Sequence, residues 1–201
     1  MKKLLFTLSS AIVLTVILSV SIFAAKTYTV VKGDSLWKIA VKNQIGLSEI
    51  KSANPQIKNY DLIYPGQVIN LPIGDEVADK YEKEVVRLVN LERAKYGLPE
   101  LTEDWQLSRV ARYKSQDMSE NNYFSHTSPT YGSPFEMMKN FGISYRSAGE
   151  NIAKGQASPQ AVVNAWMNSQ GHRANILNKS YTKIGVGYEA DGKYWTQMFI
   201  S

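Results

Sequence analysis

The stretch that decides the fold at the N-terminal end is YTVVKGDSLWKIA, residues 28–40. Its β-branched and aromatic residues are typical of a short strand, and Gly33 begins a turn that ends it. Asp34 or Ser35 can then cap a helix, because their side-chain oxygens accept the unpaired N–H groups of a first helical turn. Apolar residues recur on one side of that helix, at Leu36, Ile39 and Ala40. The stretch therefore predicts a strand, a turn and a helix.

The residues that follow predict a second helix and a closing strand. A short helix is expected over residues 47–53, and Asn54-Pro55 stops it because the residue before a proline avoids helical geometry. Residues 64–67 form a turn, and the apolar run 68–72 is expected as a strand. A unit this small is marginally stable alone, so we expect its apolar residues to share one core.

Three blocks of this unit resemble the LysM family: residues 28–40, IKSANP at 50–55 and IYPGQVINLP at 63–72. The resemblance implies a βααβ fold that binds the N-acetylglucosamine-containing glycan of peptidoglycan or chitin. It also implies a groove lined by two loops, whose residues are Gly33, Asp34, Ser35 and Leu36 in the first and Asn54, Pro55, Gln56 and Ile57 in the second. The alternative is that Gly33 and Pro55 only make turns and that Leu36 belongs to the core.

The first 25 residues have the layout of a secretory signal peptide. Lys2 and Lys3 form a short basic start, and residues 4–25 follow without a charged residue. This run is also long enough to cross a bilayer, which needs roughly 20 apolar residues, so an uncleaved anchor is the alternative. Both interpretations predict that residue 26 onward is exported, and only the second predicts contact with a membrane.

Charge and cysteine content exclude several partners and chemistries. Without Lys2 and Lys3, Lys and Arg number 21 instead of 23 against 18 acidic residues, a net charge of +3. This dispersed excess is too small to predict nucleic-acid binding, which calls for a clustered basic face. The chain has no cysteine, which excludes disulfides, thiolate metal ligands and a thiol nucleophile.

A polar segment at residues 74–80 predicts a linker between a first domain over 26–73 and a second over 81–201. Helical spacing starts at Tyr81 and ends before Gly97. Further helices are expected over 104–120, over 133–140 and from Ser158 onward. Strands are expected over 184–188 and 194–199, joined across the hairpin signal Asp191-Gly192. Helices combined with an antiparallel sheet predict an α+β fold.

Two histidines and one glutamate are the candidates for chemistry in the second domain. His126, Glu150 and His172 could supply three zinc ligands with water in the fourth position, or a base, an acid and an orienting group. The alternative is that each of them makes only local hydrogen bonds. Other paired acids, such as Glu82 and Glu84, are expected on solvated helix faces.

Five motifs of the second domain resemble the CAP superfamily of cysteine-rich secretory, antigen and pathogenesis-related proteins, in its bacterial form. They are YFSH at 123–126, GENIA at 149–153, AWMNS at 165–169, GHRANIL at 171–177 and IGVG at 184–187 with Tyr194-Trp195. The resemblance implies an α-β-α sandwich with a cleft lined by two histidines and two acids. His126, Glu150 and His172 match three of the four positions. The fourth acid is replaced by Ser169, so any metal site should be weaker or more open.

Two functions follow for an exported protein of this kind, together with a structural alternative. The first is a binding protein, anchored on wall glycan by LysM, whose CAP cleft takes a lipid, a wall fragment or a metal ion. The second is an enzyme that LysM targets to the wall, with His126, Glu150 and His172 as a hydrolytic site, metal-assisted or not. The third is a component of wall or spore-coat assembly. All three predict a location outside the cell, in the wall or at a spore surface.

Overall fold

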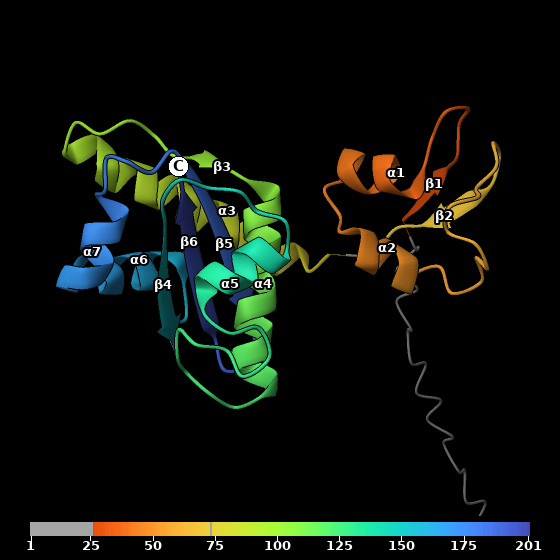
Figure 1. The fold of residues 1–201 in the computed structure, drawn as a ribbon. Helices are drawn as coiled ribbons and strands as arrows, with labels where there is room; N and C mark the ends of the chain where they lie inside the picture. The colour runs from red at the N-terminus through yellow and green to blue at the C-terminus, as the bar shows by residue number, and fades with distance from the viewer. Residues whose placement is uncertain (1–25, 73) are drawn as a thin grey trace, which may run out of the picture.

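The computed structural model describes residues 26–72 and 74–201, which fold into two units (Figure 1). The leader or anchor predicted for residues 1–25 lies outside the described residues. Among the helices that are described, none is at once long enough and apolar enough to cross a membrane.

The first unit has the predicted βααβ order. Strand β1 (Thr27–Thr29) pairs antiparallel with β2 (Val68–Asn70), and helices α1 (Leu36–Lys42) and α2 (Leu47–Ser52) lie between them in sequence. Ser35 caps α1, since its Oγ accepts the N–H of Lys38 at 3.2 Å. One buried cluster joins all four elements: Val30, Leu36, Ile39, Ala40, Ile50, Ile57, Ile69 and Leu71. The predictions of a shared core and of a buried Leu36 are confirmed.

The second unit is a four-stranded sheet between two layers of helices (Figure 1). The sheet order is β3 (Thr102–Glu103), β5 (Lys183–Glu189), β6 (Tyr194–Ile200) and β4 (Ala148–Lys154). One layer holds α3 (Glu76–Lys95), α6 (Pro159–Met167) and α7 (Gln170–Ile176), and the other holds α4 (Trp105–Glu120) and α5 (Pro134–Asn140). The predicted α-β-α sandwich is therefore present.

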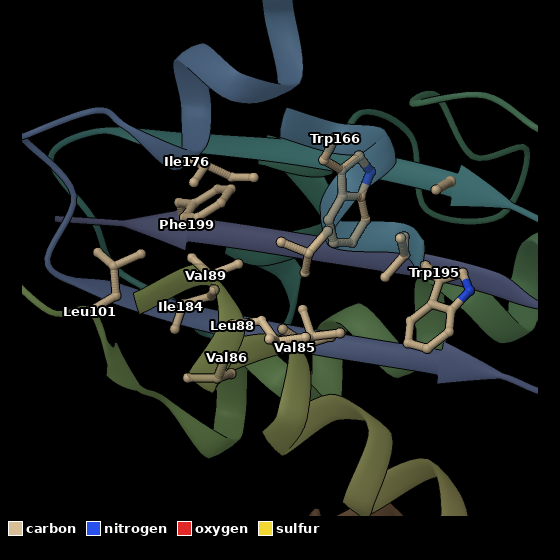
Figure 2. Close-up of a cluster of buried hydrophobic side chains, with 14 of the residues drawn as sticks. Val85, Val86, Leu88, Val89, Leu101, Trp166, Ile176, Ile184, Trp195 and Phe199 are labelled. Carbon is tan, nitrogen blue, oxygen red and sulfur yellow. The ribbon is translucent and has the colours of Figure 1, made fainter. Parts of the chain in front are cut away.

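Strand β6 lies between β5 and β4 and is buried along its whole length. Its side chains alternate between the two helical layers, as the pleat of a strand requires. Trp195 and Phe199 pack with α3 and α6, and Figure 2 shows them at opposite ends of the cluster that also holds Trp166 and Val89. Met198 packs with α4 and α5 on the opposite face. Trp166, Tyr194, Trp195 and Phe199 are buried, and Trp105 is half-buried.

Most helix starts follow the predicted capping residues, and α3 is the exception. Asp104 caps α4, Ser133 and Glu136 form a reciprocal capping box on α5, and Ser158 caps α6. Helix α3 begins at Glu76, with Asp75 as its cap, and not at Tyr81. Residues 76–80 are thus helical, and the predicted linker differs from the structure because Asp75 starts the helix before its apolar face begins.

One side chain connects the two units. The guanidinium of Arg109 in α4 donates to both carboxylate oxygens of Glu49 in α2, at 2.5 and 2.9 Å, and to the hydroxyl of Ser48 at 2.8 Å. A Cβ on Gly46 would lie 2.1 Å from the Arg109 Nε atom. A methyl group at position 46 would therefore displace the ends of the Arg109 and Glu49 side chains.

Two glycines of β5 let helix α4 lie directly against the sheet. A Cβ on Gly185 would come within 2.3 Å of the backbone carbon of Leu107, and one on Gly187 within 2.2 Å of that of Ala111. Both glycines face α4, because they pair with Met198 and Thr196 of β6. The close approach of a helix backbone is therefore the reason for glycine at these two positions of β5.

Gly187→Ala is expected to lower the free energy of unfolding by roughly 1–3 kcal/mol, because the added methyl must push α4 away from β5. Urea denaturation would measure the change. The matched control is Gly171→Ala in α7, where an added Cβ meets no atom within 4 Å and stability should change by about 1 kcal/mol or less. Equal stability of the two variants would contradict the packing argument.

Glu82 was expected on a solvated helix face, and the structure corrects this. Its side chain is only 1% exposed. It accepts from Arg112 Nε of α4 at 2.7 Å and from the backbone N–H of Tyr188 in β5 at 3.0 Å. Strand β3 is too short to reach Tyr188, so Glu82 satisfies a donor at the open edge of β5. Helical spacing cannot reveal this, because the partners come from α4 and β5.

Burial raises the pKa of Glu82 to about 7, even though Arg112 and the Tyr188 N–H favour the charged form. The folded protein therefore holds this proton more tightly than the unfolded chain does. The contribution of Glu82 to the free energy of unfolding is then full below its ordinary pKa of 4.5 and is lost as pH rises through about 7.

Glu82→Gln is expected to remove about 1–3 kcal/mol of the fall in unfolding free energy between roughly pH 5 and pH 8. Urea denaturation at several pH values would measure it. The control is Glu84→Gln on the same helix, where the acid is exposed and paired with Arg87, and which should retain the wild-type pH dependence. An unchanged slope in Glu82→Gln would contradict the assignment.

Candidate functional site

His126 and Glu150 form a hydrogen-bonded pair at the edge of the sheet. The Nδ1 atom of His126 lies 2.7 Å from Oε1 of Glu150. The imidazole is 53% exposed and the carboxylate 1% exposed. A buried carboxylate accepting from Nδ1 holds the ring in one orientation and leaves Nε2 to meet a ligand or exchange a proton. Sequence analysis named both residues, and the structure brings them together.

Glu150 owes its position to the pairing of β4 with β6, in which it lies opposite Met198. Burial raises the pKa of Glu150, while the hydrogen bond from His126 and the charges of Lys114 and His126 lower it. Its second oxygen, Oε2, is buried without a hydrogen-bond partner among the described residues. Oε2 is therefore free to accept a hydrogen bond, and burial disfavours the charged form of the carboxylate.

His172 lies in α7, which a network of amide side chains fastens to β4. The Nδ2 group of Asn175 donates to Oδ1 of Asn151 at 2.9 Å and to the carbonyl of Glu150 at 3.2 Å. Asn151 donates in turn to the carbonyl of His172 at 3.1 Å and to Gln197 at 2.9 Å. Burial lowers the pKa of His172, and the charge of His126 lowers it further.

The amide network was missed by sequence analysis as a set of positioning residues. Asn151 and Asn175 both lie within motifs quoted above, but the sequence could not show that their side chains contact each other. Gln197 is fully buried and carried no signal, because a glutamine in a strand pattern normally faces solvent.

The arrangement does not fit a metal centre. In residues 26–72 and 74–201, no three His, Cys, Asp or Glu side chains come together in a group that could hold a metal ion. Oε1 of Glu150 is already engaged by His126. Ser169, at the fourth position, is the residue before α7 and makes no capping hydrogen bond with its side chain. His126, Glu150 and His172 therefore do not form the zinc site that their residue types allow.

The predicted glycan-binding residues of the first unit fall into two groups. Those whose surface is open to solvent are Gly33, Ser35, Pro55 and Gln56, with Asp34 half-buried. Leu36, Ile57 and Asn54 are buried. Asn54 joins α2 to β2, since its amide donates to the carbonyls of Ile50 and Asn70 and accepts the Asn70 N–H. This placement differs from the predicted groove position and makes Asn54 a structural residue.

Two exposed aromatic residues beside these loops were missed. Trp37 is 61% and Tyr64 59% exposed. Tyr64 lines a shallow hollow of about 440 Å³ together with Gln56, Ile57, Lys58, Asn59, Leu62 and Gln67. Sequence analysis assigned position 64 to a turn, and only the folded loop shows that its ring faces solvent.

The comparisons with known proteins agree with this fold. Residues 86–199 match the cysteine-rich secretory protein family (CAP), and residues 28–72 match the LysM domain. The matched CAP region covers more than half of the chain. The chain therefore belongs to the cysteine-rich secretory protein family, with a LysM domain preceding its CAP domain. LysM followed by CAP is the architecture of a cell-wall-associated, glycan-binding protein.

Individual relatives are similar over one part or the other. The uncharacterized protein YkwD of Bacillus subtilis is 66% identical over 120 residues, 60% of this chain and 47% of its own length. An extracellular protein from Bacillus anthracis with an SCP domain has a solved structure with a TM-score of 0.60 and 35% identity, over 68% of this chain and 47% of that one.

A third relative is similar over the LysM region only. The probable autolysin LDP of Staphylococcus aureus is 51% identical over 45 residues, 22% of this chain and 15% of its own length. The chain spans just under half the length of the two longer matches and a small part of this one.

Proposed function

We propose that this is an exported protein held on peptidoglycan by its LysM domain, with a CAP cleft around His126, Glu150 and His172 that binds a ligand at the wall. The observation that carries the first half is the LysM match over residues 28–72, together with the exposure of Gly33, Ser35, Pro55 and Gln56 in its two loops. The same role would apply in the cell wall or at a spore surface.

The chemistry of the loops suits an acetamido sugar. Such sugars present amide and hydroxyl groups together with an apolar ring face. Gly33, with φ of 91°, and Ser35 present backbone and hydroxyl groups, and Gln56 adds an amide. Tyr64 beside the hollow offers a ring face on which a sugar can stack. Peptidoglycan is the expected partner, and nucleic acid is not.

The combined Gln56→Ala and Tyr64→Ala substitutions are expected to weaken binding of the full chain to insoluble peptidoglycan about tenfold or more, equivalent to roughly 1.4 kcal/mol. Co-sedimentation over a range of wall concentrations would measure it. The control is Phe135→Ala, which truncates an exposed aromatic residue of the CAP domain and should sediment like the wild type. A wild-type chain that stays in the supernatant would overturn the proposed anchoring.

The CAP cleft is proposed as a binding site because it combines an exposed imidazole with a buried acceptor. Phe124, two residues before His126 in the same loop, is half exposed and offers an apolar surface. A ligand with both apolar and hydrogen-bonding groups fits this combination, as a wall fragment or a lipid does. The missing acid at Ser169 favours binding over hydrolysis, because it removes one candidate acid–base group from the site.

A wall hydrolase is the second candidate, because the pairing of His126 with Glu150 at 2.7 Å is also how an enzyme orients a general base. The likeness to the probable autolysin LDP does not decide between the two, since it covers LysM alone.

The wild type and a His126→Ala/Glu150→Ala variant are both expected to sediment with peptidoglycan and to release no soluble products. Chromatography of the supernatant, with and without added zinc, would measure product release. An added lysozyme-type enzyme serves as the positive control for the assay. Products from the wild type alone would replace the binding function by a hydrolytic one.

A further inference from the structure

The loop that carries His126 has little regular structure of its own. It runs from Asn121 to Ser133 between α4 and α5, and one isolated bridge, between Ser128 and Gly132, is its sheet-like feature. Loops of this length without secondary structure are usually functional. His126 itself is more than half exposed, so its position against Glu150 must be set by neighbouring residues.

Asp117, in the last turn of α4, gathers this loop around one carboxylate. Its side chain accepts from Ser128 Oγ at 2.7 Å, from Thr130 Oγ1 at 2.6 Å and from Asn121 Nδ2 at 2.9 Å, and it also accepts from the Tyr123 hydroxyl. The four donors bracket His126 on both sides in sequence. Asp117 is only 5% exposed, so these bonds form out of water, where hydrogen bonds to a charged group are strong.

Lys114 completes the arrangement one turn earlier on α4. It is fully buried, and its ammonium donates to the Tyr123 hydroxyl at 2.9 Å. Tyr123 therefore receives one hydrogen bond from Lys114 and gives one to Asp117. Burial lowers the pKa of Lys114, and the charges of Glu150 and Asp117 oppose that effect. A positive charge at this point offsets the two buried acids that flank the loop.

We infer that Asp117, supported by Lys114, is the positioning residue of the cleft and holds the 121–133 loop so that His126 meets Glu150 before any ligand arrives. A loop ordered in advance spares the ligand the entropy of ordering it. The inference rests on the proposed role of His126 in ligand binding. The sequence of α4 did not predict this role for Asp117, because an aspartate in a helix normally faces solvent.

The test is the NMR signal of the His126 ring in the full chain, which is resolvable because the chain has only two histidines. Asp117→Ala should move and broaden the His126 ring signals away from their wild-type shift. The His172 signals, which depend on α7, should change much less. Asp117→Asn should restore part of the wild-type shift, because an amide oxygen still accepts and its NH₂ can donate to a hydroxyl.

Ser115→Ala is the matched control on the same helix. Ser115 is also fully buried and bonds to Gly187 and Thr196 of the sheet, at 3.0 and 2.9 Å, without touching the loop. It should lose stability and keep the wild-type His126 signals. An Asp117→Ala variant with unchanged His126 signals would overturn the inference, and so would a Ser115→Ala variant that moves them equally.

If Asp117→Ala does not fold, Thr130→Val tests the same inference. It removes one of the four donors and keeps Asp117, so the His126 signals should move in the same direction by a smaller amount. Unchanged signals there would count against the inference. These measurements need no ligand. Loss of wild-type sedimentation with peptidoglycan would therefore defeat the proposed function while leaving the positioning role intact.

Discussion

The two-sided burial of β6 is the constraint on which the rest of the CAP domain depends. Every residue from Tyr194 to Ile200 is buried. The side chains on each face of the strand must therefore pack against a layer of helices. That requirement fixes the strand's register, because a slip by one residue would exchange its two faces. Strand β4 is then held in a set position along β6, and Glu150 is held opposite Met198.

Around the candidate site, hydrogen-bond networks hold the elements in position, whereas apolar packing does so in the core. The amides of Asn151 and Asn175 fasten α7, and Asp117 fastens the loop after α4. Apolar contacts are non-directional, whereas each of these hydrogen bonds specifies a geometry. Buried networks of this kind add geometric specificity, while Glu150 Oε2 and Gln197 Nε2 stay without a hydrogen-bond partner among the described residues. These networks place two histidines from distant segments beside one strand of the sheet.

The elements of the first unit and most of those of the second were predictable, because their signals are local. Strands β3 and β4 and helix α7 were not predicted. The capping residues Ser35, Asp104 and Ser133 act within one helical turn, and the Asp191-Gly192 turn acts between adjacent strands. Glu82 was misassigned for the opposite reason. Its partners stand about 30 and 106 positions away in the chain, so spacing along α3 could not show that it is buried.

By itself, the sequence determined most of the elements, the two families and the identity of His126, Glu150 and His172 as candidates. These depend on short motifs that can be recognised from the sequence alone. The tertiary structure alone decided that His126 pairs with Glu150, that Asn54 is a core residue and that Asp117 gathers the loop. The physical reason is that a hydrogen bond depends on atoms a few ångströms apart, and only folding brings residues distant in sequence to that separation.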